Sequence, residues 1–216
     1  MANEVDWYAF SRKKLSEDVI QSLADHLKWE EVFRFSELSE TLIEKYAQPD
    51  DWVIISQFQT LSESFIEKHS SEVDWEKISA HQTLSCDFIE KYLDKVTWYE
   101  ISRFQKLELE FIEKYHDRLL MHVVSRFQTL TMDLIRKLKD KVDWGHIVKY
   151  QTFDEEFVTE FESKINFCDL MRFKSHILSN GFYKLHFEKL ICTLLAEICN
   201  NTHRPFFEPI KRKTDA

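Results

Sequence analysis

The chain has 216 residues, a formal net charge of −9, and 44% hydrophobic and 31% charged residues. This composition is typical of a globular protein with a sizeable core and excludes a disordered chain. The acidic balance argues against a general nucleic-acid-binding protein, because such proteins usually carry an excess of basic residues. Only two glycines and three prolines are present. Since a protein of many strands and tight hairpins needs more of both, the composition favours helices.

A tandem repeat of about 23 residues occupies most of the chain, and tryptophan marks its period. The six tryptophans are Trp7, Trp29, Trp52, Trp75, Trp98 and Trp144. Successive tryptophans are 22 or 23 residues apart, except that the last gap spans two periods and holds Met121 at the place of the missing one. We therefore expect seven repeats within residues 1–166.

Each repeat is expected to contain two short helices. In the repeat that begins at Trp52, this residue and Ile55 lie on one helical face, which predicts a first helix over about 52–59. The hydroxyl of Ser62 can accept a hydrogen bond from a free backbone N–H, as an N-cap residue does. It therefore predicts a second helix over about 63–70.

Residues of capping type recur before both helices. Before the first helices they are Asp6, Asp51, Asp74, Thr97 and Asp143. Before the second helices the corresponding positions hold Ser16, Ser39, Ser62, Ser85, Glu108, Thr131 and Asp154, of which all but Glu108 are of capping type. Glu100 stands three residues after Thr97, which completes the pattern of a capping box. On the second helices an acid stands four residues before a lysine, as in Asp87 and Lys91, and predicts ion pairs within one helix.

Helices of about eight residues are unstable alone, because few hydrogen bonds offset the free energy cost of nucleation. A single pair also cannot bury its apolar face, whereas stacked pairs build a continuous core. We therefore expect an all-α solenoid, right- or left-handed, of short antiparallel helix pairs. Residues 167–200 are expected to form a helical C-terminal cap, with one helix stopped by Gly181 and a longer one over about 182–199. Residues 201–216 are expected to form an extended tail.

The stretch from Asp51 to Lys68 carries a recognisable pattern, Asp-Trp-x-x-Ile-Ser-x-x-Gln-x-Leu-Ser-Glu-x-Phe-Ile-Glu-Lys. It resembles the helical-pair repeats of about 23 residues in proteins of large DNA viruses and some phages. The resemblance covers residues from about 6 to 166, and Met121 and Phe167 depart from its tryptophan. It implies a helical array and a viral or phage source. It carries no catalytic residues and so implies no chemistry.

Three columns of identical residues run through the repeats. The glutamine column consists of Gln59, Gln82, Gln105, Gln128 and Gln151, and the serine column of Ser11, Ser56, Ser79, Ser102 and Ser125. The glutamines are expected to satisfy backbone groups in the turns rather than to bind a peptide or a base. The serines are expected where helices approach closely, and not as nucleophiles. The tryptophans are expected to pack in the core rather than to cage a ligand.

A candidate binding ridge lies on the exposed face of the first helices. At 100° per residue, the places one, two and five after each tryptophan point away from the core stripe. In the later repeats these places hold Tyr99, Arg103, His122, Arg126, His146 and Lys149. Arginine forks beside aromatic rings suit phosphate, carboxylate or an acidic partner. The alternative is ordinary solvated charge that faces glutamates of the same array. Arg12 and Arg34 extend the ridge, and Gln57 and Ala80 interrupt it.

Motifs for catalysis or metal binding are missing from the sequence. None of HExxH, GxxxxGK[ST], GxGxxG or GxSxG occurs, and the nine histidines form no metal-binding pattern. We therefore expect no enzyme, no metal and no cofactor, although a site assembled across repeats would escape a search for linear motifs. The four cysteines are expected to be reduced core thiols. Without a signal peptide or an apolar run of about 18 residues, a cytoplasmic location is expected.

Two functional hypotheses follow. The first is a non-enzymatic scaffold that binds a protein partner through the exposed face of the first helices, in the host cytoplasm if the source is viral. An acidic surface on that partner would match the ridge. The second is a viral antagonist of host defence that sequesters a nucleotide, and hence a small anionic ligand, or that mimics nucleic acid. Membrane and nucleic-acid partners are not expected. A third hypothesis is an enzyme whose site spans several repeats.

Overall fold

The computed structural model describes residues 5–188 and residue 191. All regular structure within these residues is helical, which confirms the predicted all-α repeat fold. The chain divides into two compact units, the first ending at Thr129 and the second beginning at Leu130. Each unit is described by itself.

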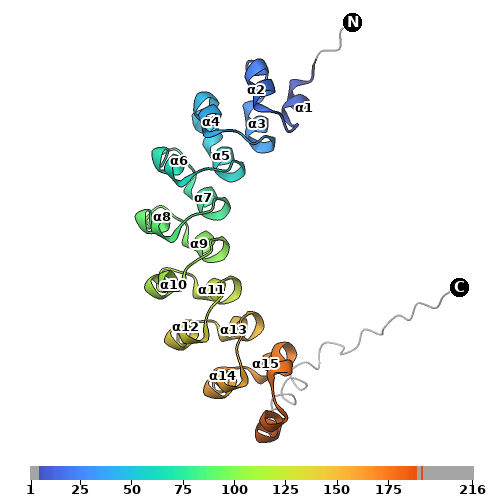
Figure 1. Cartoon of the computed structure of the whole chain (residues 1–216), viewed down its shortest axis with the longest axis vertical. Helices are drawn as coiled ribbons and strands as arrows, with labels where there is room; N and C mark the ends of the chain where they lie inside the picture. The colour runs from blue at the N-terminus through green and yellow to red at the C-terminus, as the bar shows by residue number, and fades with distance from the viewer. Residues whose placement is uncertain (1–4, 189–190, 192–216) are drawn as a thin grey trace, which may run out of the picture. The chain divides into compact units, whose positions relative to one another are not determined.

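The first unit is a series of helix pairs that follow the 23-residue period. Figure 1 shows its odd-numbered helices in one row and its even-numbered helices in a second row. The odd row consists of α1 (Trp7–Ser11), α3 (Trp29–Phe35), α5 (Trp52–Phe58), α7 (Trp75–His81), α9 (Trp98–Phe104) and α11 (Met121–Phe127). The even row consists of α2 (Glu17–Leu23), α4 (Glu40–Tyr46), α6 (Glu63–Lys68), α8 (Cys86–Lys91) and α10 (Leu109–Tyr115). A 3-10 turn, η1 (Pro49–Asp51), precedes α5. Successive odd-numbered helices pack against each other.

The second unit continues the same alternation. Its helices are α12 (Met132–Lys137), α13 (Trp144–Tyr150), α14 (Glu155–Glu160), α15 (Phe167–Lys174) and the 3-10 turn η2 (Ser175–Ile177). The chain is helical again over 180–188, and the Ser179 hydroxyl accepts from the Phe182 N–H at 3.1 Å. The prediction that Gly181 stops a helix was therefore wrong, because Ser179 starts a new helix whose first turn contains this glycine. The rest of the predicted helix to 199, the tail 201–216, Cys192 and Cys199 lie outside the described residues.

In each unit the core consists of two columns of β-branched aliphatic side chains, one from the odd-numbered and one from the even-numbered helices. The β-branched aliphatic residues with no exposed surface in the even-numbered helices are Ile20, Ile43, Ile66, Ile89, Ile112, Ile135 and Val158. Those in the odd-numbered helices are Val32, Ile55, Ile78, Ile101, Val124 and Ile147. Because each helix has only about two turns, it depends on this shared burial rather than on its own hydrogen bonds for stability.

The tryptophans line the edge of the core and not its centre. Trp52 is 5% exposed, but the other five are half-buried. Trp75 packs on Tyr92 of the same repeat, with ring centroids 4.8 Å apart, and its indole N–H donates to the Ser70 carbonyl at 3.0 Å. An indole needs a partner for its N–H and tolerates a wet edge, which explains this position. The isoleucines fill the centre that the sequence assigned to the tryptophans.

The capping predictions held at most but not all positions. Among the first caps, the carboxylates of Asp6, Asp74 and Asp143 accept backbone N–H groups. Among the second caps, Ser62, Ser85, Thr131 and Asp154 do so. Asp51 was predicted wrongly, because it belongs to η1 and accepts from the Gln48 N–H at 2.9 Å. The capping box at Thr97 is absent as well, and no cap bond forms at Ser16, Ser39 or Glu108.

The glutamine column holds neighbouring repeats together, as predicted. The Gln82 amide nitrogen donates to the carbonyls of Ser56 and Gln59 at 2.9 and 2.8 Å. Its amide oxygen accepts from the Leu61 N–H at 3.0 Å. Gln59 and Gln105 repeat this triplet with the preceding repeat. These amides are buried and satisfy turn backbone that would otherwise lack partners.

The serine column adds a second link between repeats. The Ser79 hydroxyl, fully buried, donates to the Trp75 carbonyl at 2.6 Å and accepts from the Thr97 N–H of the next repeat at 3.0 Å. Ser11 and Ser102 make the same pair of bonds. Close approach of helices accounts for the small side chain, and the hydrogen bonds account for its hydroxyl. These hydroxyls act in packing and are not placed as nucleophiles.

The exposed side of the even row carries ion pairs between repeats. Lys68 bonds Glu44, Lys91 bonds Glu67, and Lys114 bonds Glu90, each pair 24 residues apart. The ion pair predicted within one helix between Asp87 and Lys91 is therefore replaced by a bond to the preceding repeat. Hydrogen bonds from Lys68 and His69 hold the pKa of Glu44 below its ordinary value. Each of these exposed pairs contributes little to stability, but together they link neighbouring repeats.

Candidate functional site

The six candidate residues fall into two groups, one in each unit. Tyr99 and Arg103 lie on α9, and His122 and Arg126 lie on the adjacent helix α11 of the first unit. His146 and Lys149 lie on α13 of the second unit. All of them except His146 are exposed.

From the second repeat onward, the second place after the tryptophan is buried or half-buried and does not point outward as predicted. His146 is half-buried, and Glu31 and Val123 at the same place in their repeats are buried. Each odd-numbered helix has only two turns, and the first turn lies against the preceding repeat. Glu31, for example, pairs with Arg12 of that repeat, with Nε and Oε2 3.6 Å apart. A helical wheel for a single helix omits this neighbour.

The sixth place, six residues after the tryptophan of each repeat, carries a column of exposed aromatic rings that the sequence argument missed. The exposed rings are Phe35, Phe58, Phe104, Phe127 and Tyr150, with exposed fractions of 39–52%. Their spacing is a multiple of 23 residues, so the signal was present in the sequence. It was missed because only the places one, two and five after each tryptophan were considered as exposed. Aromatic side chains in a row on a surface are enriched at protein interfaces.

Two of the cations at the fifth place, Arg103 and Lys149, each lie between two aromatic rings. The guanidinium carbon of Arg103 is 4.8 Å from the Phe104 ring centroid and 5.4 Å from that of Phe127 in the next repeat. In the second unit, Lys149 Nζ is 5.1 Å from the Tyr150 centroid and 5.2 Å from that of Phe173. Cations at these distances are attracted to the ring faces. The rings therefore hold each of these two charges in place on its own helix. We call one such cation with its rings a rung.

The rungs differ in whether the chain supplies a carboxylate. Arg12 pairs with Glu31, and Arg34 pairs with Glu30 at 3.4 Å. At these two places the arginine faces a glutamate of the same array, as the alternative of ordinary solvated charge predicts. Within the described residues, Arg103 has no carboxylate within ion-pair distance, and Tyr99 Oη accepts its only side-chain hydrogen bond at 3.2 Å. Lys149 likewise has two ring contacts and no carboxylate within ion-pair distance in that part of the chain. These two rungs can therefore offer their charge to a ligand.

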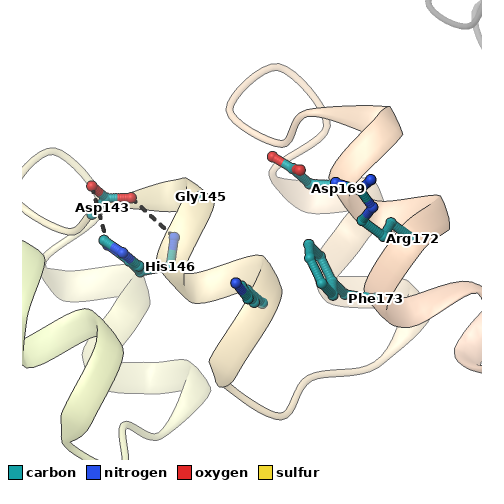
Figure 2. A pocket seen from close by; sticks show the side chains of 7 residues that line it. Asp143, Gly145, His146, Asp169, Arg172 and Phe173 are labelled. Carbon is teal, nitrogen blue, oxygen red and sulfur yellow. Dashed lines mark hydrogen bonds and ion pairs between the residues drawn. The ribbon is translucent and has the colours of Figure 1, made fainter. Parts of the chain in front are cut away.

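An open pocket of about 300 Å³ adjoins Lys149 in the second unit. It is lined by Asp143, Gly145, His146, Lys149, Asp169, Arg172 and Phe173. Figure 2 shows Asp143 turned toward His146 on one wall and Asp169, Arg172 and Phe173 on the facing helix. The backbone N–H of His146 donates to Asp143 Oδ1 at 3.0 Å, and the ring Nδ1 of His146 lies 3.3 Å from Asp143 Oδ2. The pocket thus combines an Asp–His wall with a wall formed by Asp169, Arg172 and Phe173.

Chemistry beyond binding has little support in the described residues. Burial raises the pKa of the Cys86 thiol, which disfavours the reactive thiolate. Cys86 and Cys168 are half-buried rather than fully enclosed in the core. No group of three His, Cys, Asp or Glu within the described part of the chain could hold a metal ion.

Comparison of the chain with protein-family models, curated proteins and solved structures gave no match. Among residues 5–188 and 191, every helix is too short or too polar to cross a membrane. The function is therefore argued from the geometry of the odd row.

Proposed function

We propose that the chain is a non-enzymatic repeat scaffold that binds the acidic surface of a protein partner through its odd-numbered helices. The observation that carries this proposal is Arg103, an exposed guanidinium held between Phe104 and Phe127 with no carboxylate partner among the described residues. Arginine and aromatic residues dominate the binding energy of many protein interfaces. The buried glutamine and serine columns, by contrast, already have partners within the array.

The distribution of charge supports the same surface. Acidic residues outnumber lysine and arginine in every labelled even-numbered helix except α12. In the odd row this holds only for α3. At physiological salt, charges more than about 8 Å apart are largely screened, so an acidic partner responds to the local ridge rather than to the net charge of −9.

A reversal of charge on α9 and α11 tests the proposal. We expect the double variant Arg103→Glu/Arg126→Glu to lose at least about tenfold in affinity for proteins that immobilised wild-type chain retains from a cell extract. The matched control is Lys45→Glu/Lys91→Glu, which makes the same charge change on the even row. Since these side chains are exposed, the unfolding free energy should change by less than about 0.5 kcal/mol per substitution. Retention of the same proteins by the ridge variant would contradict the proposal.

A second candidate function rests on the pocket of the second unit. Lys149, Arg172 and the Phe173 ring offer two cations and a stacking face to a small planar anion. A nucleotide has this chemistry, and under the viral resemblance it would be a host signal that the protein sequesters. Within the described residues neither cation has a carboxylate within ion-pair distance.

A thermal-shift titration with ATP and GTP tests the second candidate. At about 100 times Kd, a bound ligand adds about 2.7 kcal/mol of stability, which raises Tm by several degrees. We expect Arg172→Glu to abolish this shift and Lys45→Glu to leave it intact. Absence of a shift with wild-type protein at millimolar nucleotide would exclude the pocket as a nucleotide site.

A further inference from the structure

We propose that the pocket of the second unit selects guanine nucleotides, with Asp169 binding the edge of the base and with Lys149 and Arg172 binding the phosphates. This inference rests on the second candidate function and names the ligand of that same pocket. All three side chains line the pocket and belong to one unit.

An ion pair that forms in the first unit is missing from this pocket. Arg12, at the fifth place on α1, pairs with Glu31, at the second place on α3. Lys149 and Asp169 hold the same two places on α13 and α15, yet they are not within ion-pair distance. Within the described residues, the Asp169 carboxylate has no hydrogen bond and no ion pair. Both charges therefore line the pocket without a partner from this part of the chain.

The two kinds of charge are separated along α15. Lys149 Nζ lies 5.2 Å from the Phe173 ring centroid, and the guanidinium carbon of Arg172 lies 6.0 Å from the same centroid. Both cations thus gather at Phe173, whereas Asp169 lies in the first turn of α15. Asp169 precedes this ring by about 6 Å along the helix axis. Figure 2 shows both residues on one wall.

A ligand that satisfies both ends must carry hydrogen-bond donors at one end and negative charge at the other. A purely anionic ligand would bring its charge near Asp169, and a purely cationic one would face Lys149 and Arg172. A nucleotide carries its base edge and its phosphates at opposite ends. The pocket volume of about 300 Å³ is at the lower end of the range for ligand sites, so it suits a single nucleotide.

The carboxylate of Asp169 discriminates between the bases. An ionised carboxylate only accepts hydrogen bonds, and its two oxygens can accept from two neighbouring donors. Guanine has two such donors side by side, the ring N1–H and the exocyclic N2 amine. Adenine has one amine beside an acceptor nitrogen, which would face a carboxylate oxygen with no proton between them. A site with hydrogen-bonding groups discriminates against a ligand that leaves them unpaired.

Gly145 opens the pocket at a place where other repeats carry a side chain. The first place after the tryptophan holds Tyr8, Glu30, Val53, Glu76, Tyr99 and His122 in the preceding repeats or Met121 repeat. Gly145 lines the pocket, and a Cβ at this residue would lie 3.3 Å from Asp143 Oδ1. Because tyrosine occurs at this place in two repeats, Gly145→Tyr would fill the pocket with a residue that the repeat fold accepts.

Titration calorimetry on the full chain tests the choice of base. We expect GTP to bind at least about tenfold more tightly than ATP, and more tightly than inosine triphosphate, whose base lacks the N2 amine. Asp169→Asn should remove this preference, because an amide offers one donor and one acceptor in place of two acceptors. The matched control Asp87→Asn makes the same change on an exposed residue of α8 and should leave the preference intact.

A second pair of variants tests the pocket itself. Gly145→Tyr should abolish binding of GTP, whereas Val53→Tyr, at the same place on α5, should not. Binding of GTP that Gly145→Tyr leaves intact would put the ligand elsewhere and refute the inference.

Other outcomes separate the choice of base from the nucleotide function. Equal affinities for GTP and ATP that Arg172→Glu abolishes would refute the choice of base and leave the second candidate function standing. Inorganic triphosphate that binds as tightly as GTP would show that phosphate alone is recognised, which also refutes it. Absence of binding by any nucleotide would refute the second candidate function together with this inference, and the extract experiment would still decide the scaffold function.

Discussion

Replacing Gln59 with leucine is expected to lower the free energy of unfolding by about 3–5 kcal/mol. The Gln59 amide nitrogen donates to the carbonyls of Phe33 and Ser36 at 2.5 and 2.7 Å, and its oxygen accepts from the Leu38 N–H at 3.0 Å. The side chain is only 4% exposed, so water would not replace it readily. Each buried polar group left without a partner costs about 1–3 kcal/mol.

Urea unfolding followed by circular dichroism measures this loss. The matched control is Gln57→Leu, two residues earlier, because Gln57 is half-buried and makes no hydrogen bond with the described residues. We expect this control to change the unfolding free energy by less than about 0.5 kcal/mol. Similar effects of the two substitutions would mean that the glutamine column does not join the repeats.

Replacing Ile89 with alanine is expected to destabilise the protein by about 2–5 kcal/mol. Ile89 has no exposed surface and stands in the middle of the even-row column, so its removal leaves a cavity that neighbouring repeats fill only in part. Val53→Ala is the control, because Val53 is 47% exposed on α5 and leaves no cavity. Thermal unfolding should separate the two by several degrees. A loss below about 1 kcal/mol at Ile89 would contradict a continuous core.

Much of the fold could be predicted because the repeat supplies several independent copies of each signal. The expected helices over about 52–59 and 63–70 correspond to α5 (Trp52–Phe58) and α6 (Glu63–Lys68). The role of the glutamine column followed from the need to satisfy turn backbone. Gly181 was misjudged because it occurs once, outside the regular repeats, where the Ser179 cap outweighed the usual preference for glycine at helix ends.

The candidate site was predicted less completely, because it depends on contacts between repeats. The sequence analysis assigned both Arg103 and Arg34 to the exposed ridge, yet of these two only Arg34 has a glutamate within ion-pair distance. It placed Lys91 with Asp87, whereas the side chain reaches Glu67 of the preceding repeat. A helical wheel represents a single helix, so it cannot predict contacts with side chains of the neighbouring repeat. The aromatic column at the sixth place could have been recognised from its constant spacing, as Phe104 and Phe127 show.

The central claim is that buried glutamine side chains bind the turn backbone of adjacent repeats and so join the repeats to one another. Hydrogen exchange at the Leu61 and Leu84 amides tests it most directly. Both lie outside the helices, and they donate to Gln82 and Gln105 at 3.0 Å. The account predicts that these two amides exchange as slowly as the core helical amides of Ile78 and Ile89. Exchange as fast as in an open loop would contradict it.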